Sequence, residues 1–169
     1  MSKMNIRIYK EEDSILFNSK LDNYVLSNMY PCHLTYEGIV FHSAEQLFHW
    51  MIFSENKFVR EGIMKFKGVC NGFQVKNFCD KHADKIDKDY DSKKYKCLTK
   101  CLEIKFLQCF EFRKAVLDSG SKNLVEFAPW DSEYGAKWDS WEEAYIGINA
   151  CGRCMMMVRE NAINGLYSV

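Results

Sequence analysis

The stretch VLSNMYPCHLTYEGIVFHSAEQLFHWMIF, Val25 to Phe53, decides the fold of this 169-residue chain. Two short runs rich in aromatic and β-branched residues, 33–36 and 39–42, flank the pair Glu37-Gly38. A residue pair ending in glycine between two such runs is typical of a tight β-hairpin. After residue 43 the apolar residues recur at helical spacing. The stretch therefore predicts a hairpin that is followed directly by a helix.

The start of this helix is the first candidate for chemistry. Ser43 and Gln46 have the spacing of a capping box, with Ser43 as the N-cap. Glu45 then lies in the first turn, where unpaired backbone N–H groups and the helix dipole favour an anionic ligand or an ionised carboxylate. His49 follows on the same helical face, where a glutamate and a histidine can exchange or position protons. A purely structural role for both residues stays open, because acidic residues are common in first turns.

Composition indicates one ordinary globular domain over residues 1–169. The chain has 23 basic and 23 acidic residues, so a basic excess that would attract nucleic acid or membranes is absent overall. No apolar run resembles a secretory signal or a membrane span. We therefore expect the eight cysteines to be reduced thiols and the protein to act in the cytoplasm of a cell or an infected host, without a membrane partner.

The rest of the chain predicts an α+β fold that is mainly helical, with a small antiparallel sheet near the N-terminus. Strands are expected at 6–9, 14–17 and 123–128, and helices at 55–66, 73–83, 95–117 and 149–162. We expect Phe58 to face inward. In the long helix the expected buried face consists of Leu98, Cys101, Leu102, Ile104, Lys105, Leu107 and Phe110. The charge-dense run 84–94 is predicted to be a solvated connection, and residues 138–141 are predicted to continue a loop that starts at 130.

This loop, Trp130 to Gly135, is the second candidate, because it is rich in aromatic and acidic residues. Loops on a rigid scaffold often carry binding groups. An ionised carboxylate that faces a ring-stacking loop suits cleavage at a sugar, where positive charge develops on the ring. Acids and aromatics also share many loops for ordinary structural reasons, so the pattern alone is not specific.

The cysteines raise the question of a metal site. Cys79-x-x-His82 and Cys151-x-x-Cys154 have ligand-like spacings that could together hold zinc. Both pairs fall on predicted helices, where cysteines three residues apart are commonly small buried residues. We therefore expect no metal and no cofactor. The sequence also lacks a phosphate-binding glycine-rich loop.

Several short motifs follow one another along the chain. The first two are LSNMYPC at 26–32 and G-x-x-F-x-S-x-E-Q at 38–46. Lys105-Phe106, LVEFAPWDSEYG at 124–135, and the pattern G-x-N-x-x-G-x-x-M-M-x-x-R at 147–159 come after them. In sequence and in order, over most of the chain, these motifs resemble those of the NADAR family of YbiA-like N-glycosidases.

The resemblance implies a multihelical YbiA-like fold and hydrolysis of an N-glycosidic bond to ribose. The expected partner is a small ribosylated molecule, such as a ribosyl phosphate of an amino-pyrimidine from riboflavin synthesis. ADP-ribose attached to guanine in nucleic acid is the other substrate class that the family implies. A non-catalytic protein that binds ADP-ribose or a nucleotide, and a structural or zinc-dependent interaction protein, remain the alternatives.

The resemblance also implies roles for individual residues. Glu45 corresponds to the family's catalytic carboxylate. Ile52 stands where the family often has lysine, and we expect His49 to act with Glu45 in its place. Tyr134 stands where the family has a pocket tryptophan. The residues expected to bind substrate are Asn28, Tyr30, Ser43, Trp130, Asp131, Tyr134, Gly135 and Asn149.

Overall fold

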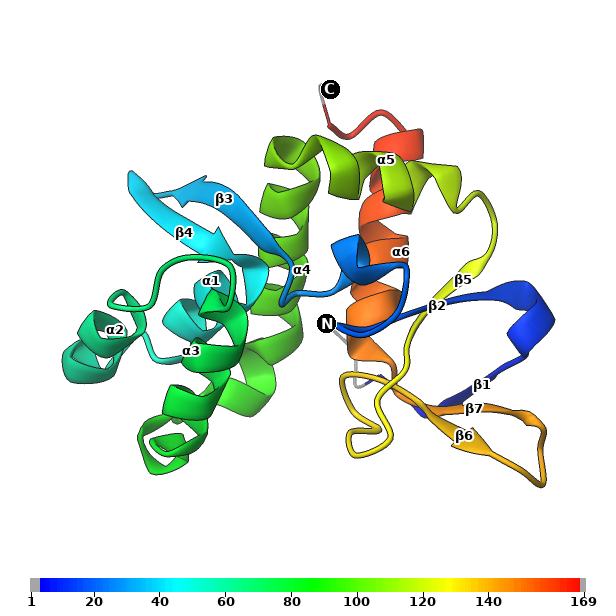
Figure 1. The fold of residues 1–169 in the computed structure, drawn as a ribbon, viewed down its shortest axis with the longest axis horizontal. Helices are drawn as coiled ribbons and strands as arrows, with labels where there is room; N and C mark the ends of the chain where they lie inside the picture. The colour runs from blue at the N-terminus through cyan, green and yellow to red at the C-terminus, as the bar shows by residue number, and fades with distance from the viewer. Residues whose placement is uncertain (1–3, 168–169) are drawn as a thin grey trace. The chain divides into compact units, whose positions relative to one another are not determined.

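The computed structural model describes residues 4–167, which form two compact units (Figure 1). Unit 1 contains the chain up to Ser27 and from Glu111 onward, and unit 2 contains Asn28–Phe110. The fold is α+β and mainly α, as the sequence predicts. No helix among the described residues is both long and apolar enough to cross a membrane.

Six α-helices and seven β-strands form the regular structure of residues 4–167. The helices are α1 (Ala44–Ile52), α2 (Lys57–Ile63), α3 (Asn71–Asp80), α4 (Tyr90–Gln108), α5 (Phe110–Asp118) and α6 (Ala150–Ile163). The strands are β1 (Arg7–Tyr9), β2 (Ser14–Phe17), β3 (Pro31–Tyr36), β4 (Ile39–Ser43), β5 (Asn123–Glu126), β6 (Lys137–Asp139) and β7 (Ala144–Gly147).

Unit 2 begins with the predicted hairpin. β3 and β4 pair antiparallel, and Tyr36 lies opposite Ile39 across a two-residue turn. Both turn residues have positive φ angles, 49° at Glu37 and 76° at Gly38. Two positive φ angles are characteristic of the turn whose twist matches that of the flanking strands. The hairpin prediction is confirmed, and α1 follows β4 without a connecting loop.

The core of unit 2 lies where α1 contacts α3 and α4. Side chains from the hairpin and from these helices are buried there, among them Leu34, Phe41, Leu47, Val75, Leu98 and Leu102. Burying one such side chain contributes about 1.5–3 kcal/mol to folding. The expected inward face of the long helix is confirmed at Leu98, Cys101, Leu102, Ile104 and Lys105.

The prediction of one helix over 95–117 is wrong, because the chain breaks at Cys109. Cys109 has extended backbone angles and separates α4 from α5. Next to the break, the Gln108 side chain pairs with β3 as a strand would. Its Oε1 accepts from Thr35 N at 2.7 Å, and its Nε2 donates to Thr35 O at 2.8 Å. The break leaves Leu107 and Phe110 exposed rather than inward.

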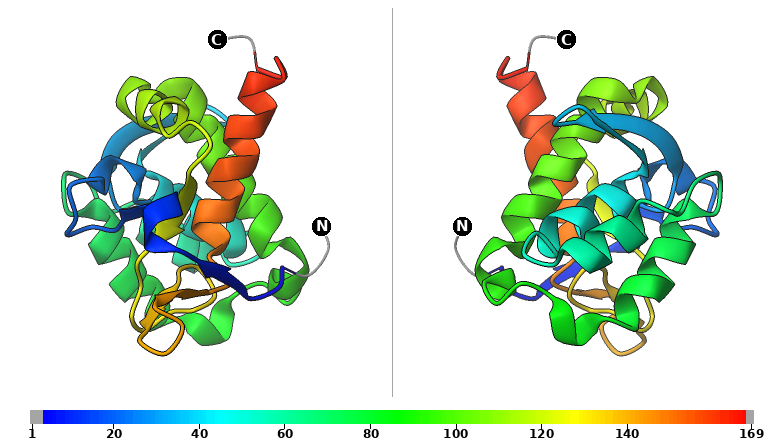
Figure 2. Two further views of the ribbon diagram at one scale, coloured as in Figure 1. Left: turned by 90° about the vertical axis from the view of Figure 1, so that its right-hand side faces the viewer. Right: turned by 90° about the vertical axis from the view of Figure 1, so that its left-hand side faces the viewer.

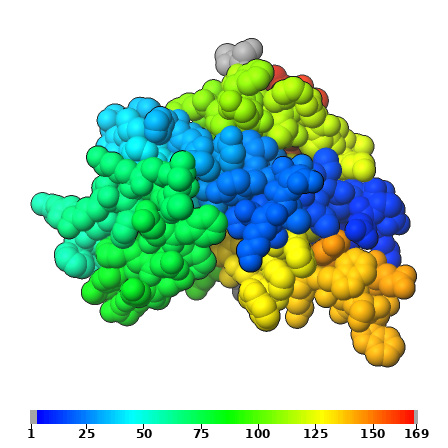
Figure 3. All heavy atoms as spheres, viewed as in Figure 1, coloured from blue at the N-terminus to red at the C-terminus, as the bar shows by residue number. Residues whose placement is uncertain are grey.

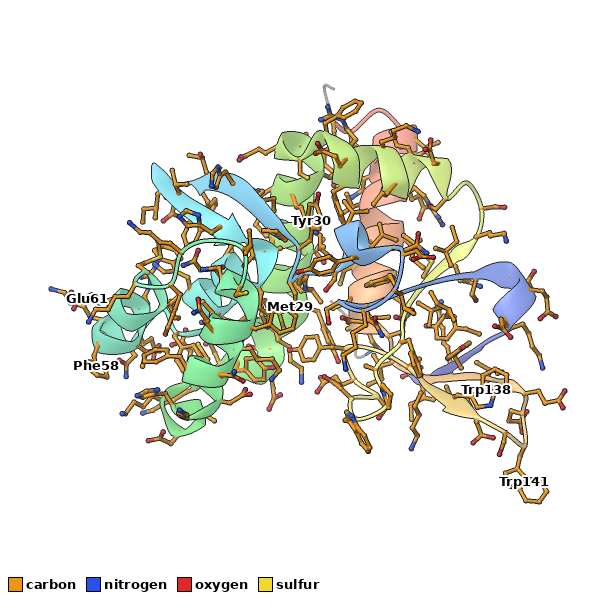
Figure 4. All side chains as sticks on the ribbon, in the orientation of Figure 1. Met29, Tyr30, Phe58, Glu61, Trp138 and Trp141 are labelled. Atoms are coloured by element: carbon orange, nitrogen blue, oxygen red, sulfur yellow. The ribbon has the colours of Figure 1, made fainter. Side chains whose placement is uncertain are left out.

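Two further expectations for unit 2 are corrected. Phe58, expected to face inward, lies in the first turn of α2 at the outer edge of the molecule, with 65% of its surface exposed (Figure 4). The helix itself is shorter than expected and starts after the cap residue Asn56. The run 84–94 is not merely a solvated connection, since Asp87 within it is buried and α4 already begins at Tyr90.

Unit 1 combines the two ends of the described chain in two small sheets. β1 pairs with β7, and β7 pairs with β6, all antiparallel. β2 and β5 form a separate parallel pair. The expectation of one antiparallel sheet near the N-terminus is therefore too simple, because β1 and β2 pair with strands more than 100 residues away. Residues 138–141 are also not all loop, since β6 extends to Asp139.

The β6–β7 hairpin ends in a tip that projects into solvent (Figure 3). Trp138 packs its ring edge-on against Tyr145 at a centroid distance of 5.1 Å. Trp141 at the tip is 95% exposed and points outward (Figure 4). Tyr145 also belongs to a buried cluster with Tyr9, Val125 and Ala136, which joins the two sheets of unit 1.

Helix α6 packs along β5 in unit 1 (Figure 2). Its buried residues include Cys151, Cys154, Met155 and Val158, which recur at three- and four-residue steps. This spacing places them on one face of the helix. The helix ends at Ile163 with Asn164 as its C-cap, and Gly165 follows with a φ of 75°, the left-handed backbone that commonly terminates helices.

A buried carboxylate links the end of α1 to the start of α4 in unit 2. Asp87 accepts hydrogen bonds from Ser54 N at 2.8 Å, Ser54 Oγ at 2.6 Å and Glu55 N at 3.0 Å, and pairs with Lys93 Nζ at 2.5 Å. Burial alone would raise the pKa of Asp87. The hydrogen bonds from Lys93, Ser54 and Glu55 outweigh that effect and hold the pKa below its usual value.

This network predicts a pH-dependent contribution to stability. Asp87→Asn should lower the free energy of unfolding by about 3 kcal/mol at pH 7, because it removes one partner of a buried ion pair. A depressed pKa in the folded state stabilises the fold above the unfolded pKa of about 3.9. The difference between wild type and variant should therefore shrink as the pH falls below about 4 in urea-unfolding titrations.

Asp89→Asn is the matched control, because Asp89 also pairs with Lys93, at 2.9 Å, but is exposed. It should cost less than about 1 kcal/mol. Equal losses for the two variants would contradict the assignment of the stability to the buried carboxylate.

Candidate functional site

The start of α1 is held by a side-chain cap in unit 2. Ser43 Oγ accepts from Gln46 N at 3.1 Å and donates to Asn71 Oδ1 at 2.6 Å. The Gln46 side chain accepts from His42 N at 2.8 Å, so it reaches back one residue beyond the cap. The predicted cap is confirmed, and Ser43 is completely buried. These contacts give Ser43 a positioning role for the residues that follow it.

Glu45 lies in the first turn of α1 as predicted. Its backbone N–H donates to Asn28 O at 3.0 Å, so the segment before the hairpin holds this residue. The Glu45 and Gln46 N–H groups at the helix start are thus used within unit 2. These two N–H groups are therefore not available to an anionic ligand.

Glu45 and His49 form a pair on one face of α1. His49 Nδ1 lies 3.5 Å from Glu45 Oε1, and the side chains of His49 and Glu45 are only 11% and 12% exposed. His49 Nδ1 also lies 3.0 Å from the backbone oxygen of Glu45. The predicted juxtaposition of these two residues is therefore confirmed by the geometry.

The contacts of His49 determine which ring nitrogen carries its proton. A carbonyl oxygen can only accept, so the hydrogen bond to Glu45 O requires a proton on Nδ1. In the neutral ring Nε2 is then the acceptor. Nε2 forms no hydrogen bond to a described residue and is not among the enclosed polar atoms. It can therefore take a proton from a group outside the helix.

Two further predicted residues of unit 2 lie on the segment before β3. Asn28 is buried and fixes Glu45 through its backbone oxygen, as described above. The ring of Tyr30 lies 5.5 Å from Lys105 Nζ. Lys105 is completely buried, which is rare for lysine, and the sequence predicts only that it faces inward. Two features of the sequence could have marked Lys105 as a site residue: its place on the inward face of the long helix, and its membership of the family-like Lys-Phe pair.

The thiols near this region are not activated. Burial and, second, the charge of Glu45 raise the pKa of Cys79 to about 12. A hydrogen bond with Cys109 and burial raise the pKa of Cys32 well above its usual value. Because the thiolate is the nucleophile, neither cysteine is suited to attack a substrate at neutral pH. The acid-base groups of the region are Glu45 and His49.

The aromatic-acidic loop lies in unit 1 and is shaped by Asp131. Asp131 Oδ1 accepts from Glu133 N at 2.9 Å and from Tyr134 N at 3.0 Å. Such an Asx turn fixes the local backbone. Oδ2 forms no hydrogen bond to a described residue. Tyr134 is half-buried, whereas Trp130 is almost fully exposed. Substrate binding by these three side chains stays a prediction.

The loop backbone satisfies the start of α6. The carbonyls of Ser132, Glu133, Tyr134 and Gly135 accept from the N–H groups of residues 148–151 at 2.7–3.0 Å. These bonds occupy the helix N–H groups that would otherwise be unpaired. Gly135 is required at this contact, because a Cβ there would lie 2.6 Å from Glu126 O.

Asn149 is the N-cap of α6 and connects the helix to β5. Its backbone is left-handed, with a φ of 53°. Its Oδ1 accepts from Glu126 N at 3.0 Å, and its Nδ2 donates to Leu124 O at 2.9 Å. Asn149 is completely buried, so these contacts give it a positioning role. Nearby Gly152 has no room for a side chain, since a Cβ would lie 1.9 Å from Leu124 O.

The predicted site residues thus fall into two sets. Asn28, Tyr30, Ser43, Glu45 and His49 belong to unit 2, and Trp130, Asp131, Tyr134, Gly135 and Asn149 belong to unit 1. The structure brings Glu45, His49 and Asn28 together within unit 2. Within unit 1 it brings the loop and Asn149 together at the start of α6.

The spacings considered for zinc are likewise divided between the units. Cys79 and His82 belong to unit 2, and Cys151 and Cys154 belong to unit 1. Among residues 4–167, no three histidine, cysteine, aspartate or glutamate side chains gather as a set of metal ligands.

Comparison with known proteins links this geometry to a family. The NADAR domain pattern matches residues 16–162. The solution NMR structure of the Escherichia coli protein YbiA is similar to this chain, with a TM-score of 0.72 and 25% sequence identity. The similarity covers 92% of this chain and 89% of YbiA. A search among curated proteins found no match.

The contacts of Asn149 predict a large structural effect. Asn149→Ala should lower the free energy of unfolding by about 3 kcal/mol, because it leaves a buried N–H and a buried carbonyl without partners. Alanine also tolerates the left-handed backbone less well than asparagine. Chemical unfolding followed by circular dichroism measures the loss.

Asn161→Ala on the same helix is the control. Its Nδ2 makes one half-buried hydrogen bond, to Tyr167 Oη at 3.3 Å, so the variant should cost less than about 1 kcal/mol. A smaller loss at 149 than at 161 would refute the positioning role.

Proposed function

The chain belongs to the NADAR family, and on this premise we propose that it is an N-glycosidase that cleaves the bond between ribose and a base. The proposed substrates carry ribosyl phosphate or ADP-ribose on an amino-pyrimidine or a guanine base. The single observation that carries the proposal is the Glu45–His49 pair in the first turns of α1. A carboxylate can stabilise the positive charge that develops on the sugar, and a histidine beside it can move a proton, so the pair suits such a hydrolysis.

In the proposed reaction, the bond between ribose C1′ and the base nitrogen breaks, and its electron pair leaves with the base. Positive charge then develops on C1′ and the ring oxygen, which the Glu45 carboxylate stabilises. A water oxygen bonds to C1′ and gives up one proton, while the base nitrogen gains one. Glu45 accepts the proton of the water. His49 Nε2, which is not occupied by a described residue, takes a proton from solvent and delivers it to the base nitrogen.

One observation favours the alternative of a non-catalytic binder of ADP-ribose or a nucleotide. Ile52, where the family often has lysine, is buried in α1 and supplies no acid-base group. If that lysine position were required for chemistry, the protein would bind without cleaving. The two functions are separated by measuring turnover and affinity on the same variants.

Glu45→Gln is the first test. It keeps the size and hydrogen bonding of the side chain but removes its charge, so base release should fall about a thousandfold or more. Affinity for the substrate should change far less, because the ground-state sugar is neutral and the interaction strengthens in the transition state. Base release is measured by chromatography after incubation with ribosylated amino-pyrimidines and with an oligonucleotide that carries ADP-ribosylated guanine.

Glu61→Gln is the matched control, because Glu61 is an exposed helical glutamate of the same unit, on α2. It should leave base release unchanged. Full activity of Glu45→Gln would reject Glu45 as the catalytic carboxylate. Tight binding without turnover by the wild-type protein would favour the binder.

His49→Gln tests the second member of the pair. Turnover should fall about a hundredfold, which is typical of a lost acid-base group, and the pH dependence of turnover should change shape. His82→Gln is a close control, because His82 Nδ1 makes the same i,i−4 contact to a backbone oxygen, Phe78 O at 2.9 Å, without a glutamate beside it. Unchanged turnover and pH profile in His49→Gln would return His49 to a packing role.

A further inference from the structure

Unit 1 contains an open hollow that none of the predicted site residues lines. It has a volume of about 710 Å³ and lies among β1, the turn before β5 and the C-terminal half of α6. Pockets for small molecules usually measure about 300–1,000 Å³. The hollow is therefore of a size that fits a small ligand.

The charged groups that line this hollow are mostly positive. Arg7, Arg153 and Arg159 contribute three guanidinium groups, and Glu160 contributes the one carboxylate of the lining. Three positive charges and one negative charge leave a net charge of +2. Among residues 4–167, none of the three arginines forms an ion pair with a carboxylate. The chain as a whole has no net charge, so this local excess is notable.

Arg159 is the most unusual of the three. It is only 8% exposed, and its Nη1 donates to Ser119 Oγ at 2.6 Å and to Lys122 O at 2.9 Å. Both acceptors are neutral, and burial lowers the pKa of Arg159 without a carboxylate to oppose that effect. A buried cation without a partner of opposite charge is costly.

The remaining donors of Arg159 are available at the hollow. A guanidinium has five N–H donors, and Nε and Nη2 make no hydrogen bond to a described residue. These atoms are also not among the enclosed polar atoms without a partner. They therefore reach solvent, and Arg159 is one of the residues that line the hollow. Nε and Nη2 form the planar fork that suits two oxygens of one anion.

Arg153 and Arg7 extend this positive surface. Arg153 precedes Arg159 by six residues on α6 and is half-buried. Its Nη1 donates to Asn5 O at 2.9 Å, which fixes the side chain and again uses a neutral acceptor. Arg7 lies on β1, where its backbone pairs with Gly147, and its side chain is exposed. Two elements therefore hold the three guanidinium groups around one space.

Met156 and Met157 give the hollow an apolar side next to the arginines. Methionine side chains are polarisable and adapt to flat or irregular apolar groups. A ligand that fits this combination carries a strong negative charge at one end and an apolar or planar group at the other.

We propose that this hollow binds a small organic phosphate, with the phosphate on the three arginines and the organic part on Met156 and Met157. A phosphate dianion matches the net charge of +2 and has enough oxygens for several guanidinium donors. A nucleic-acid strand fits less well, because its affinity depends on many basic contacts along the backbone. The proposal is independent of base cleavage by Glu45, which belongs to the other unit.

The experiment uses phenyl phosphate as the probe and follows binding in two ways. Calorimetry of the full chain should show saturable binding at one site. In protein labelled with ¹³C at the methionine methyl groups, the signals of Met156 and Met157 should shift. Those of Met51 and Met64, which belong to unit 2, should stay in place. Inorganic phosphate should bind more weakly than phenyl phosphate, because it cannot use the apolar side.

Charge variants provide the control. The double variant Arg7→Ala/Arg153→Ala should bind phenyl phosphate about tenfold more weakly or worse, and it leaves the buried Arg159 intact so that the fold survives. Lys20→Ala removes a positive charge from an exposed position of unit 1 outside the hollow and should bind as wild type.

Four results would overturn the proposal: no saturable binding, equal losses in both variants, methionine shifts only in unit 2, or equal affinity for phenyl phosphate and inorganic phosphate. Tighter binding of an oligonucleotide at the same arginines would also overturn it, in favour of nucleic acid.

Discussion

The geometry around Glu45 depends on a buried polar network that begins at Ser43. The hydroxyl of Ser43 joins the start of α1 to Asn71 at the start of α3. Gln46 is completely buried. Its side-chain oxygen accepts from the hairpin backbone, and its nitrogen donates to the carbonyl of Ile63, the last residue of α2, and to that of Phe66 beyond it. A buried amide left without such partners costs about 1–3 kcal/mol, so every part of the network must be present together. The orientation of the Glu45–His49 pair follows from it.

Local signals explain what could be predicted from the sequence. The Glu37-Gly38 turn, the Ser43 cap and the i,i+4 spacing of Glu45 and His49 each depend on residues within a few positions, and all are found in the structure. The break between α4 and α5 could not be predicted, because it contains no glycine or proline. It accompanies the pairing of Gln108 with Thr35, 73 residues away.

The same distinction applies to the candidate site. Family-like motifs identified Asn149 and the loop before it, but only the structure shows that the asparagine side chain ties α6 to β5. Likewise, helical spacing predicts that Lys105 faces inward, yet its position beside the Tyr30 ring depends on two distant segments. Residues that act through long-range contacts leave little trace in local patterns, so their roles emerge only in three dimensions.

The division into two units has a consequence for the order in which the protein can fold. Unit 2 is one continuous segment, so all of its internal contacts can form as soon as residue 110 has left the ribosome. Unit 1 is discontinuous, and β2 must wait for β5, whose residues follow it by more than 100 positions. Pairing across such a separation closes a long loop and is intrinsically slow. The N-terminal strands therefore remain without partners during synthesis, while the unit that carries Glu45 can already be complete.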